Sequence, residues 1–354
     1  MRSRIIGSGF ALGENLITNQ DLAGMMDTTD EWIRERTGIE KRYYVEHGTT
    51  TSDLGVRAAE AALKDAGVAK DEVDYVVFAT MTPDYYFPGC GGLLQHKLGL
   101  RDVPALDIRQ QCTGFLYGLS VADAMLKSGH ARTVLLVGAE VHSGFILWKE
   151  WEYLFHRSEV GPTPEAKAFN SSFRDRAVLF GDAAGAVVLR ADAATEASGR
   201  GLLQFTLHSD GEHFRDLYVN TGGMAYRPYM TEEHLRESRP MPVMNGRSVY
   251  RLALKSLPQV IHEACAKQGK TVDDLKLIIP HQANLRINEA LARALKVPED
   301  KIFNNIQKYG NTTAASIPLA YHEAVKSGAV QEGDLVCFAG LGAGFHWGAV
   351  LMRQ

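Results

Sequence analysis

The chain has 354 residues, of which 45% are hydrophobic and 23% charged, so its composition is that of a globular protein long enough for two domains. Its formal net charge of −4 gives no global field that would attract nucleic acid or an anionic membrane, and no apolar run is long enough for a secretory signal or a membrane span. Cys90, Cys112, Cys265 and Cys337 lack the paired spacing of a zinc site or a disulfide framework, which favours a metal-free protein of the reducing cytoplasm.

Short apolar runs between turn residues predict strands, in chain order, over residues 4–10, 73–80, 132–140, 177–190, 275–280, 334–344 and 347–353. Longer stretches with apolar side chains at helical spacing predict helices over residues 51–67 and 249–269. Apolar strands that alternate with amphipathic helices indicate an α/β fold.

A single thiol stands where another helix is predicted to begin. Apolar side chains recur at helical spacing after Cys112, at Phe115, Leu119, Ala122, Met125 and Leu126. The first N–H groups of a helix lack partners and carry partial positive charge, which favours a thiolate at that end. Cys112 is therefore a candidate nucleophile, although most cysteines in such chains are small buried residues.

The chain repeats itself at long period. "LKDAGVAKDEVDYVVFA" (63–79) resembles "CAKQGKTVDDLKLIIPH" (265–281), "LKSG" (126–129) resembles "VKSG" (325–328), and "FGDAAGAVVL" corresponds to "GFHWGAVLM". Three matches in the same order indicate a duplication. We expect two similar α/β halves, residues 1–195 and 196–354, packed as pseudo-twofold mates.

The repeat gives Cys112 a counterpart. Cys112 lies 17 residues before Gly129 and Asn311 lies 17 residues before Gly328, so we expect equivalent helix starts that meet at the pseudo-twofold axis. His281 follows an apolar strand, at the end where α/β sheets bind ligands. Acyl transfer needs a nucleophile and neutral donors for a developing oxyanion, and these three residues offer both. The plainer interpretations are that His281 is a histidine of the core and that Asn311 only caps a helix.

Six motifs together resemble ketoacyl synthase III, the initiating condensing enzyme of fatty-acid synthesis within the thiolase superfamily. They are "TTDEWIRERTGI", "CTGFLYGLSVAD", "FGDAAGAVVL", "IPHQANLRI", "YGNTTAASIPLA" and "GAGFHWGAVLMR", which span nearly the whole chain. The resemblance implies a thiolase-like fold, in which two pseudo-twofold α/β halves form a layered αβαβα core.

The resemblance also implies a mechanism. Cys112 matches the residue that takes an acyl group from acyl-CoA, while His281 and Asn311 match the pair that stabilises the enolate formed as a malonyl thioester loses carbon dioxide. That carbanion would attack the acyl-cysteine and give a 3-oxoacyl product. The backbone N–H groups of Cys112 and Ala343 match the oxyanion hole, although relatives usually have glycine at the position of Ala343. The thioesters are substrates, and no other cofactor is implied.

Binding residues follow from the same resemblance. Trp32 and Arg36 match residues that receive the nucleotide end of coenzyme A, since an indole face suits adenine and a guanidinium suits phosphate. Gly246 and Asn284 match positions along the pantetheine tunnel.

Two further matches concern partners. Arg286 matches the basic residue that helps dock acyl carrier protein, the expected carrier of the malonyl group. Phe87 matches an aromatic residue that enters the acyl pocket of the other subunit, which implies a homodimer.

Two segments depart from the family pattern. Residues 145–175 form a longer crossing than usual, rich in large apolar residues, and residues 208–243 are polar and poorly matched. The longer segment either covers the core or dimer surface, or lines the acyl pocket and selects a primer longer than acetyl. The primer, the extender carrier and the pathway stay open.

Rival functions need residues that this chain lacks. A degradative thiolase needs a cysteine where Leu341 stands, and a head-to-head condensing enzyme has a glutamate where Phe87 stands. An acyltransferase that makes esters or amides tends to change the histidine or the asparagine. A protein that only binds acyl chains would leave Cys112 without chemistry.

Overall fold

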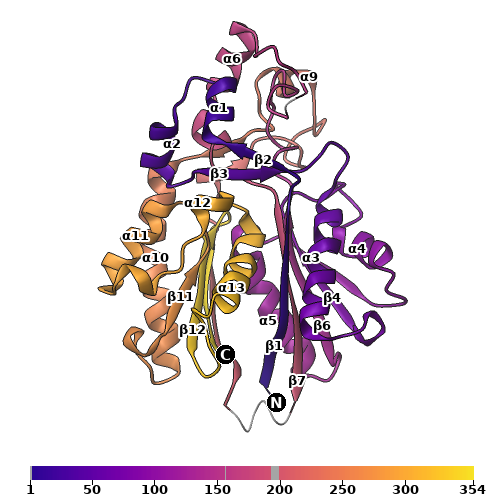
Figure 1. Cartoon of the computed structure of the whole chain (residues 1–354), viewed down its shortest axis with the longest axis vertical. Coiled ribbons are helices and arrows are strands. Elements are labelled where there is room, and N and C mark those ends of the chain that lie inside the picture. Colours follow the sequence, from indigo (N-terminus) through magenta and orange to yellow (C-terminus); the bar gives the residue numbers. More distant parts are fainter. Residues whose placement is uncertain (1, 156, 193–198) are drawn as a thin grey trace.

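A computed structural model describes residues 2–155, 157–192 and 199–354 of the chain. Two β-sheets lie face to face with helices between them and on both outer sides, so the core has five layers (Figure 1). The outer helices α3 (Thr51–Ala66) and α4 (Cys90–Leu98) cover the first sheet, and α10 (Gly246–Lys267) and α11 (Leu285–Leu295) cover the second. Between the sheets lie α5 (Gly114–Lys127) and α13 (Ser316–Lys326). This arrangement is the predicted layered αβαβα core.

The first sheet has the strand order β5-β4-β6-β7-β1, and the second has the order β11-β12-β13-β8. The strands of the first are β1 (Arg2–Leu12), β4 (Tyr75–Ala79), β5 (Ala105–Ile108), β6 (Thr133–Glu140) and β7 (Ala183–Asp192). Those of the second are β8 (Gly201–Ser209), β11 (Leu277–Pro280), β12 (Leu335–Gly342) and β13 (His346–Arg353).

The two sheets repeat one pattern of pairing. β4 and β6 are parallel, β6 and β7 antiparallel, and β7 and β1 antiparallel, and the series β11, β12, β13 and β8 has the same directions in the same order. Each interior face is lined by apolar side chains that pack on α5 and α13. The predicted boundary between residues 195 and 196 lies outside the described residues.

A cap of shorter elements covers one end of the core, at the top of Figure 1. It contains β2 (Asn15–Thr18), β3 (Lys41–Tyr44), α1 (Asn19–Met25), α2 (Asp30–Thr37), α6 (Pro164–Ser171), α7 (Arg174–Ala177), β9 (Leu217–Val219), α9 (Glu232–Arg236) and β10 (Pro242–Met244). α12 (Ile306–Tyr309) lies beside β3. The parallel strands β4 and β6 end towards this cap, which is where the site lies.

Most predicted elements are confirmed within a few residues, with one clear exception. The strand predicted over 177–190 begins only at Ala183, because Arg174–Ala177 is a helix and residues 178–182 form a loop below the cap. The strands β5 and β8 were not predicted. Among the described residues, no helix combines the length and the apolar character needed to cross a bilayer.

Candidate active site

The two inner helices begin at the same place, in the centre of the molecule. Short 3₁₀ turns, Gln111–Thr113 and Thr313–Ala315, lie in contact and lead directly into α5 and α13. The approach is close: a Cβ added to Gly114 would lie 3.5 Å from Cβ of Ala314. The expected meeting of two helix starts is therefore confirmed.

The residue equivalence predicted between Cys112 and Asn311 is wrong. Gln111 and Thr313 both have positive φ, 44° and 47°, and each stands at the start of a 3₁₀ turn, so the offset between the halves is 202 residues here. The counterpart of Cys112 is then Ala314. The offset measured from Gly129 and Gly328 is 199 because α13 is three residues shorter than α5. Asn311 still reaches the site, from the loop before the turn.

Cys112 is buried, with 9% of its surface exposed. Burial, and to a lesser extent the nearby carboxyl of Glu140, raise the pKa of its thiol to about 12, against the lowering effect of a hydrogen bond with Thr313. Glu140 is itself fully buried and accepts hydrogen bonds from the hydroxyls of Thr80 and Thr82. Burial raises the pKa of Glu140 to about 7. The surroundings therefore keep the resting thiol protonated.

His281 lies just beyond β11 and is oriented by a hydroxyl. Ser316 Oγ accepts a hydrogen bond from the Gln282 N–H and lies 2.7 Å from Nδ1 of His281. Among the described residues the hydroxyl has no other acceptor for its proton, so it donates to Nδ1, and the imidazole proton is then on Nε2. Burial lowers the pKa of His281 to about 3, with a further contribution from His142. In the described part of the chain, Nε2 has no partner. His281 is therefore a neutral donor whose buried Nε2–H has no partner among the described residues.

Asn311 is held at both its backbone and its side chain. Its N–H donates to Leu179 O at 2.8 Å, and its carbonyl accepts from Gly181 N–H at 3.1 Å. The side-chain Oδ1 accepts from the Thr313 N–H at 2.9 Å. Because Oδ1 is engaged, the amide Nδ2 is the group that remains to donate. Thr312 stands directly before the turn but makes no side-chain capping bond, so the bond that caps the turn comes from Asn311.

The glycine-rich turn between β12 and β13 lies against the thiol loop. A Cβ added to Gly342 would stand 2.8 Å from Cβ and 3.0 Å from N of Cys112, so only glycine fits there. The positive φ of this turn falls on Gly344 (141°) rather than on Ala343. The backbone of Ala343 is thus placed next to Cys112, and Ala343 does not have to adopt the left-handed backbone conformation.

Several residues around the site were not predicted from the sequence. Thr313, Ser316, Glu140 and His142 all lie around Cys112 and His281. His142 stands two residues after the end of strand β6, and the rule that singled out His281, polar residues at strand ends, would have found it.

The outer residues Trp32 and Arg36 lie together on α2. The guanidinium of Arg36 is 4.4 Å from the Trp32 ring centre, and that of Arg174 is 4.8 Å from it. Arg174 was not predicted and comes from the longer crossing segment. Two cations beside one indole form a surface suited to an aromatic, phosphate-bearing group.

The remaining predicted binding residues lie at helix starts. Gly246 is the exposed first residue of α10. Asn284 caps α11 by accepting from the Arg286 N–H, and it donates to Arg36 O. Arg286 donates to carbonyls of α2 and pairs with Glu289 at 2.8 Å. Asn284 and Arg286 thus join α11 to α2.

A cavity of about 810 Å³ reaches Gln111, Ala343 and Gly344, next to the loop of Cys112, although Cys112 itself does not line it. The poorly matched segment 208–243 supplies much of its wall, including Phe214, Leu217, Tyr218, Val219, Met230 and Pro240. Phe87 lies apart from the site in this single chain, with 81% of its surface exposed.

The longer segment packs mainly on the cap. Leu154 and Phe173 are buried against α1 and β2, and Trp148 lies in the same apolar cluster. Trp148, Trp151 and Phe155 line a separate cavity of about 280 Å³, which shares only Thr49, Val141 and Gly144 with the larger one. The large apolar side chains of this segment therefore pack mainly on the cap, while Phe145 lines the larger cavity.

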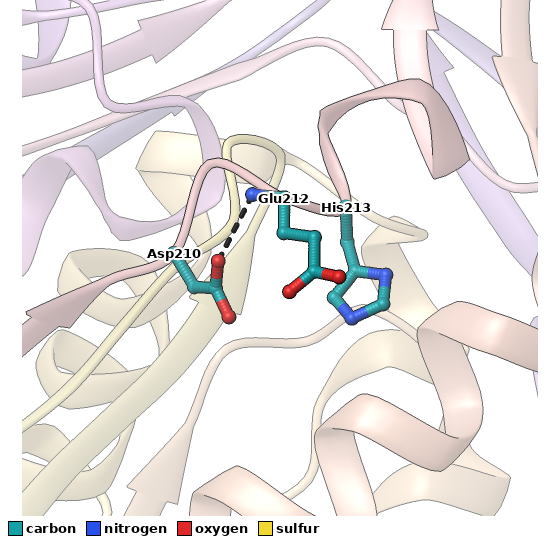
Figure 2. Close-up of side chains that lie close together, drawn as sticks. All are labelled: Asp210, Glu212 and His213. Carbon is teal, nitrogen blue, oxygen red and sulfur yellow. Dashed lines mark hydrogen bonds between the residues drawn. The ribbon is translucent and has the colours of Figure 1, made fainter.

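Three potential metal ligands gather after β8. Figure 2 shows Asp210, Glu212 and His213 on one loop, where Glu212 N–H donates to Asp210. Both carboxylates are exposed, and exposed acidic groups commonly lie together without an ion. We assign no metal to this cluster.

Known proteins share both the fold and the sequence. Residues 106–156 and 160–211 match the profile of 3-oxoacyl-[acyl-carrier-protein (ACP)] synthase III, and residues 265–354 match that of its C-terminal part. A β-ketoacyl-[acyl-carrier-protein] synthase III of Rhodospirillum rubrum is 44% identical over 356 residues, which covers 99% of each chain.

Solved structures of ketoacyl synthases share the fold of this chain. The 3-oxoacyl-[acyl-carrier-protein] synthase III of Aquifex aeolicus has a TM-score of 0.83 and 37% identity, and the match covers 99% of this chain and 100% of that one. The priming β-ketosynthase of a polyketide biosynthetic pathway has a TM-score of 0.83 and 31% identity over 99% of this chain and 96% of that one.

The two stacked sheets, with a buried thiol where their inner helices meet, define a condensing acyltransferase of thiolase-like fold. More specifically, the chain belongs to the 3-oxoacyl-[acyl-carrier-protein] synthase III family.

Proposed function

We propose that this enzyme loads an acyl group from acyl-CoA onto Cys112 and condenses it, with loss of carbon dioxide, with a malonyl group carried on acyl carrier protein. The observation that carries the proposal is one cluster that contains the buried thiol of Cys112 and two neutral donors, the Nε2–H of His281 and the amide of Asn311, with Thr313 and His142 between them. Donors of this kind stabilise an oxyanion without adding a proton to it.

In the loading half, the sulfur of Cys112 attacks the thioester carbonyl, and coenzyme A leaves as a thiol. The oxyanion of the tetrahedral intermediate accepts hydrogen bonds from the backbone N–H groups of Cys112 and Ala343, which the tight approach of Gly342 brings together. The partial positive charge at the start of α5 favours the same anion.

In the condensing half, the malonyl thioester oxygen accepts hydrogen bonds from His281 and Asn311. Cleavage of the carboxylate C–C bond releases carbon dioxide and leaves an enolate on that oxygen. Its carbon attacks the acyl-Cys112 carbonyl, the thiolate leaves, and a 3-oxoacyl thioester forms. A charged histidine would instead protonate the enolate, and the lowered pKa of His281 prevents this.

The test is intact-protein mass spectrometry after incubation with a mixed panel of acyl-CoAs, followed by malonyl-acyl carrier protein. We expect one acyl adduct per chain on Cys112, and then its loss together with a 3-oxoacyl-carrier product. A parallel reaction with malonyl-CoA identifies the extender carrier. An adduct that is discharged only by alcohols or amines, without carbon dioxide, would replace condensation by ester or amide formation.

Coenzyme A would enter beside α2. Trp32 with Arg36 and Arg174 would hold the nucleotide end, and Gly246 and Asn284 would border the pantetheine path. Arg286, at the junction of α2 and α11, would help dock acyl carrier protein. The four cysteines are free and buried, in keeping with a reducing cytoplasm.

The enzyme would act as a homodimer. Tyr85, Tyr86 and Phe87 form an exposed aromatic patch, with 62%, 56% and 81% of their surfaces exposed, and such patches mark protein interfaces. We expect sedimentation at assay concentration to give a dimer, and Phe87→Glu to shift it towards monomer. A stable, fully active monomer of the unchanged chain would contradict this.

We expect residues 208–243 to determine which acyl primers the enzyme accepts. Met230→Trp would fill part of the large cavity, so we expect the rate ratio of long to short primers to fall by about tenfold, measured by loading of Cys112. Met224→Trp is the matched control, since Met224 is 69% exposed on the same segment. Trp151→Ala should leave the ratio unchanged, and a shift in that variant would assign the pocket to the longer segment instead.

A further inference from the structure

The wall of the large cavity contains a cation that meets no opposite charge. Arg109 and Gln111 both line this cavity and stand just before Cys112 in the chain. We propose that they bind a carboxylate at the far end of the primer, so that the enzyme loads dicarboxylic acyl groups such as succinyl or glutaryl. This inference rests on the proposed function, in which the acyl chain of the primer occupies the large cavity.

Arg109 offers an unpaired guanidinium. In the described part of the chain, no carboxylate lies within ion-pair distance of it, and it donates no hydrogen bond to a described residue. Its guanidinium carbon lies 5.9 Å from the ring centre of Tyr86, a contact that neutralises no charge. The planar guanidinium presents several N–H donors in a shape that matches a carboxylate. Arg109 therefore lacks the kind of partner that it is best suited to bind.

Gln111 adds a second donor beside Cys112. Its Oε1 is buried and has no partner among the described residues. Its Nε2 makes no hydrogen bond with a described residue either, but unlike Oε1 it is not buried. Because Gln111 lines the cavity, the end of the amide that is left to meet a ligand is the donor end. Two unpaired donors, one of them charged, thus stand one residue apart in the same wall.

The other charged or readily titrating groups of this wall do not oppose a carboxylate. The side chain of Asp84 is only 2% exposed, and its oxygens accept hydrogen bonds from the backbone N–H and the hydroxyl of Ser52. Burial lowers the pKa of His346, so its imidazole is mostly neutral at pH 7. The accessible charge in the wall is therefore the positive charge of Arg109.

The position of Arg109 in the chain limits the length of the primer. Arg109 stands three residues before Cys112, so their Cα atoms lie at most about 10 Å apart even if the chain between them is extended. An acyl group of a few carbons on the sulfur can therefore reach the guanidinium with its far end. Apolar side chains of the 208–243 segment, such as Leu217 and Met230, would pack on the methylene groups in between.

The end group of the primer decides whether Arg109 gains or loses a partner. An alkyl primer of the same length would displace water from the guanidinium and offer it no acceptor, which is unfavourable. A carboxylate replaces that water with charge-assisted hydrogen bonds, which are stronger than neutral ones. A hydroxyl would accept a hydrogen bond but would leave the charge unbalanced. The cavity should therefore prefer a carboxylate over both.

The test compares two acyl-CoAs of equal chain length, glutaryl-CoA and pentanoyl-CoA, by the rate at which each loads Cys112. We expect the unchanged enzyme to prefer glutaryl-CoA at least about tenfold in kcat/KM, as charge-assisted hydrogen bonds allow. Arg109→Gln should remove most of this preference, and Arg109→Lys should keep part of it because the charge stays. Gln111→Met, which removes only a neutral donor, should lower the preference about threefold. Because the readout is a ratio, a general loss of activity cancels.

Arg215→Gln is the matched control. It also removes one positive charge near the cavity, but Arg215 is exposed and does not line the wall. It should leave the preference unchanged, and an equal loss in Arg109→Gln and Arg215→Gln would overturn the proposal in favour of general charge attraction. A third primer, 5-hydroxypentanoyl-CoA, separates charge from hydrogen bonding. If it loaded as fast as glutaryl-CoA, the carboxylate would not be the recognised group.

Pentanoyl-CoA that loads as fast as glutaryl-CoA would also overturn the proposal. So would an Arg109→Gln variant that keeps the preference but sediments as a monomer, because Arg109 would then serve the contact between subunits.

Failure of the proposed function is a different result. If no acyl-CoA formed an adduct on Cys112, the proposed function would fail, and calorimetry with Cys112→Ser would still decide the inference. Binding of glutaryl-CoA about tenfold tighter than that of pentanoyl-CoA would support it, since binding needs no chemistry. Equal affinities would overturn it.

Discussion

Cys112→Ser is expected to abolish acyl-enzyme formation, with a loss of about 10³ or more in loading rate, because a serine hydroxyl is a far weaker nucleophile than a thiolate. The change in volume is small and the side chain touches a hydroxyl, so the fold should be kept. Intact mass after incubation with acyl-CoA measures the adduct, and thermal unfolding reports the stability.

Cys265→Ala is the control for this experiment, since Cys265 is a buried thiol on α10 and alanine is the best helix former. It should load normally. Acylation that persists in Cys112→Ser and disappears in Cys265→Ala would place the nucleophile elsewhere.

His281→Ala and Asn311→Ala are each expected to lower decarboxylation of the malonyl thioester by about 10²–10³, the usual cost of removing one oxyanion donor. Loading of Cys112 should persist in both variants, because the oxyanion of that step is held by backbone N–H groups. Release of labelled carbon dioxide and intact mass separate the two steps. Two variants that decarboxylate normally would favour ester or amide formation over condensation.

The lowered pKa of His281 also predicts how decarboxylation depends on pH. Its pKa is lowered to about 3, so it stays neutral as the pH falls from 8 to 5. Protonation of His281 should therefore not lower the rate of decarboxylation over this pH range. Suppose instead that the decarboxylation rate falls between pH 8 and 5 in Asn311→Ala but not in His281→Ala. That result would show that His281 becomes charged in this range.

Sequence patterns located the helix start at Cys112, the proposed nucleophile, because a helix start is a local feature. Apolar spacing after Cys112 and an apolar strand before His281 are both read from neighbouring residues, and both features are present in the fold. The duplicated order of strands was visible for the same reason, since each half repeats its own local signals.

The equivalence of Cys112 and Asn311 failed because it was counted from the far ends of two helices that differ in length. A difference of three residues between α5 and α13 moves the counterpart to Ala314, and only the positive φ values at Gln111 and Thr313 reveal it. Helix length depends on how far each helix runs between the sheets, which is a property of packing.

By itself, the sequence determined the α/β class and the thiolase-like family, because periodicity and motif spacing are carried along the chain. The roles of Cys112, His281 and Asn311 were predicted from the same motifs and stay predictions. The tertiary structure alone decided that Thr313 meets His142, that Arg174 joins Trp32, and that residues 208–243 wall the large cavity. Each of these depends on which loops meet across the two halves. A hydrogen bond between residues 171 positions apart has no local signal, because its geometry exists only once both sheets are packed.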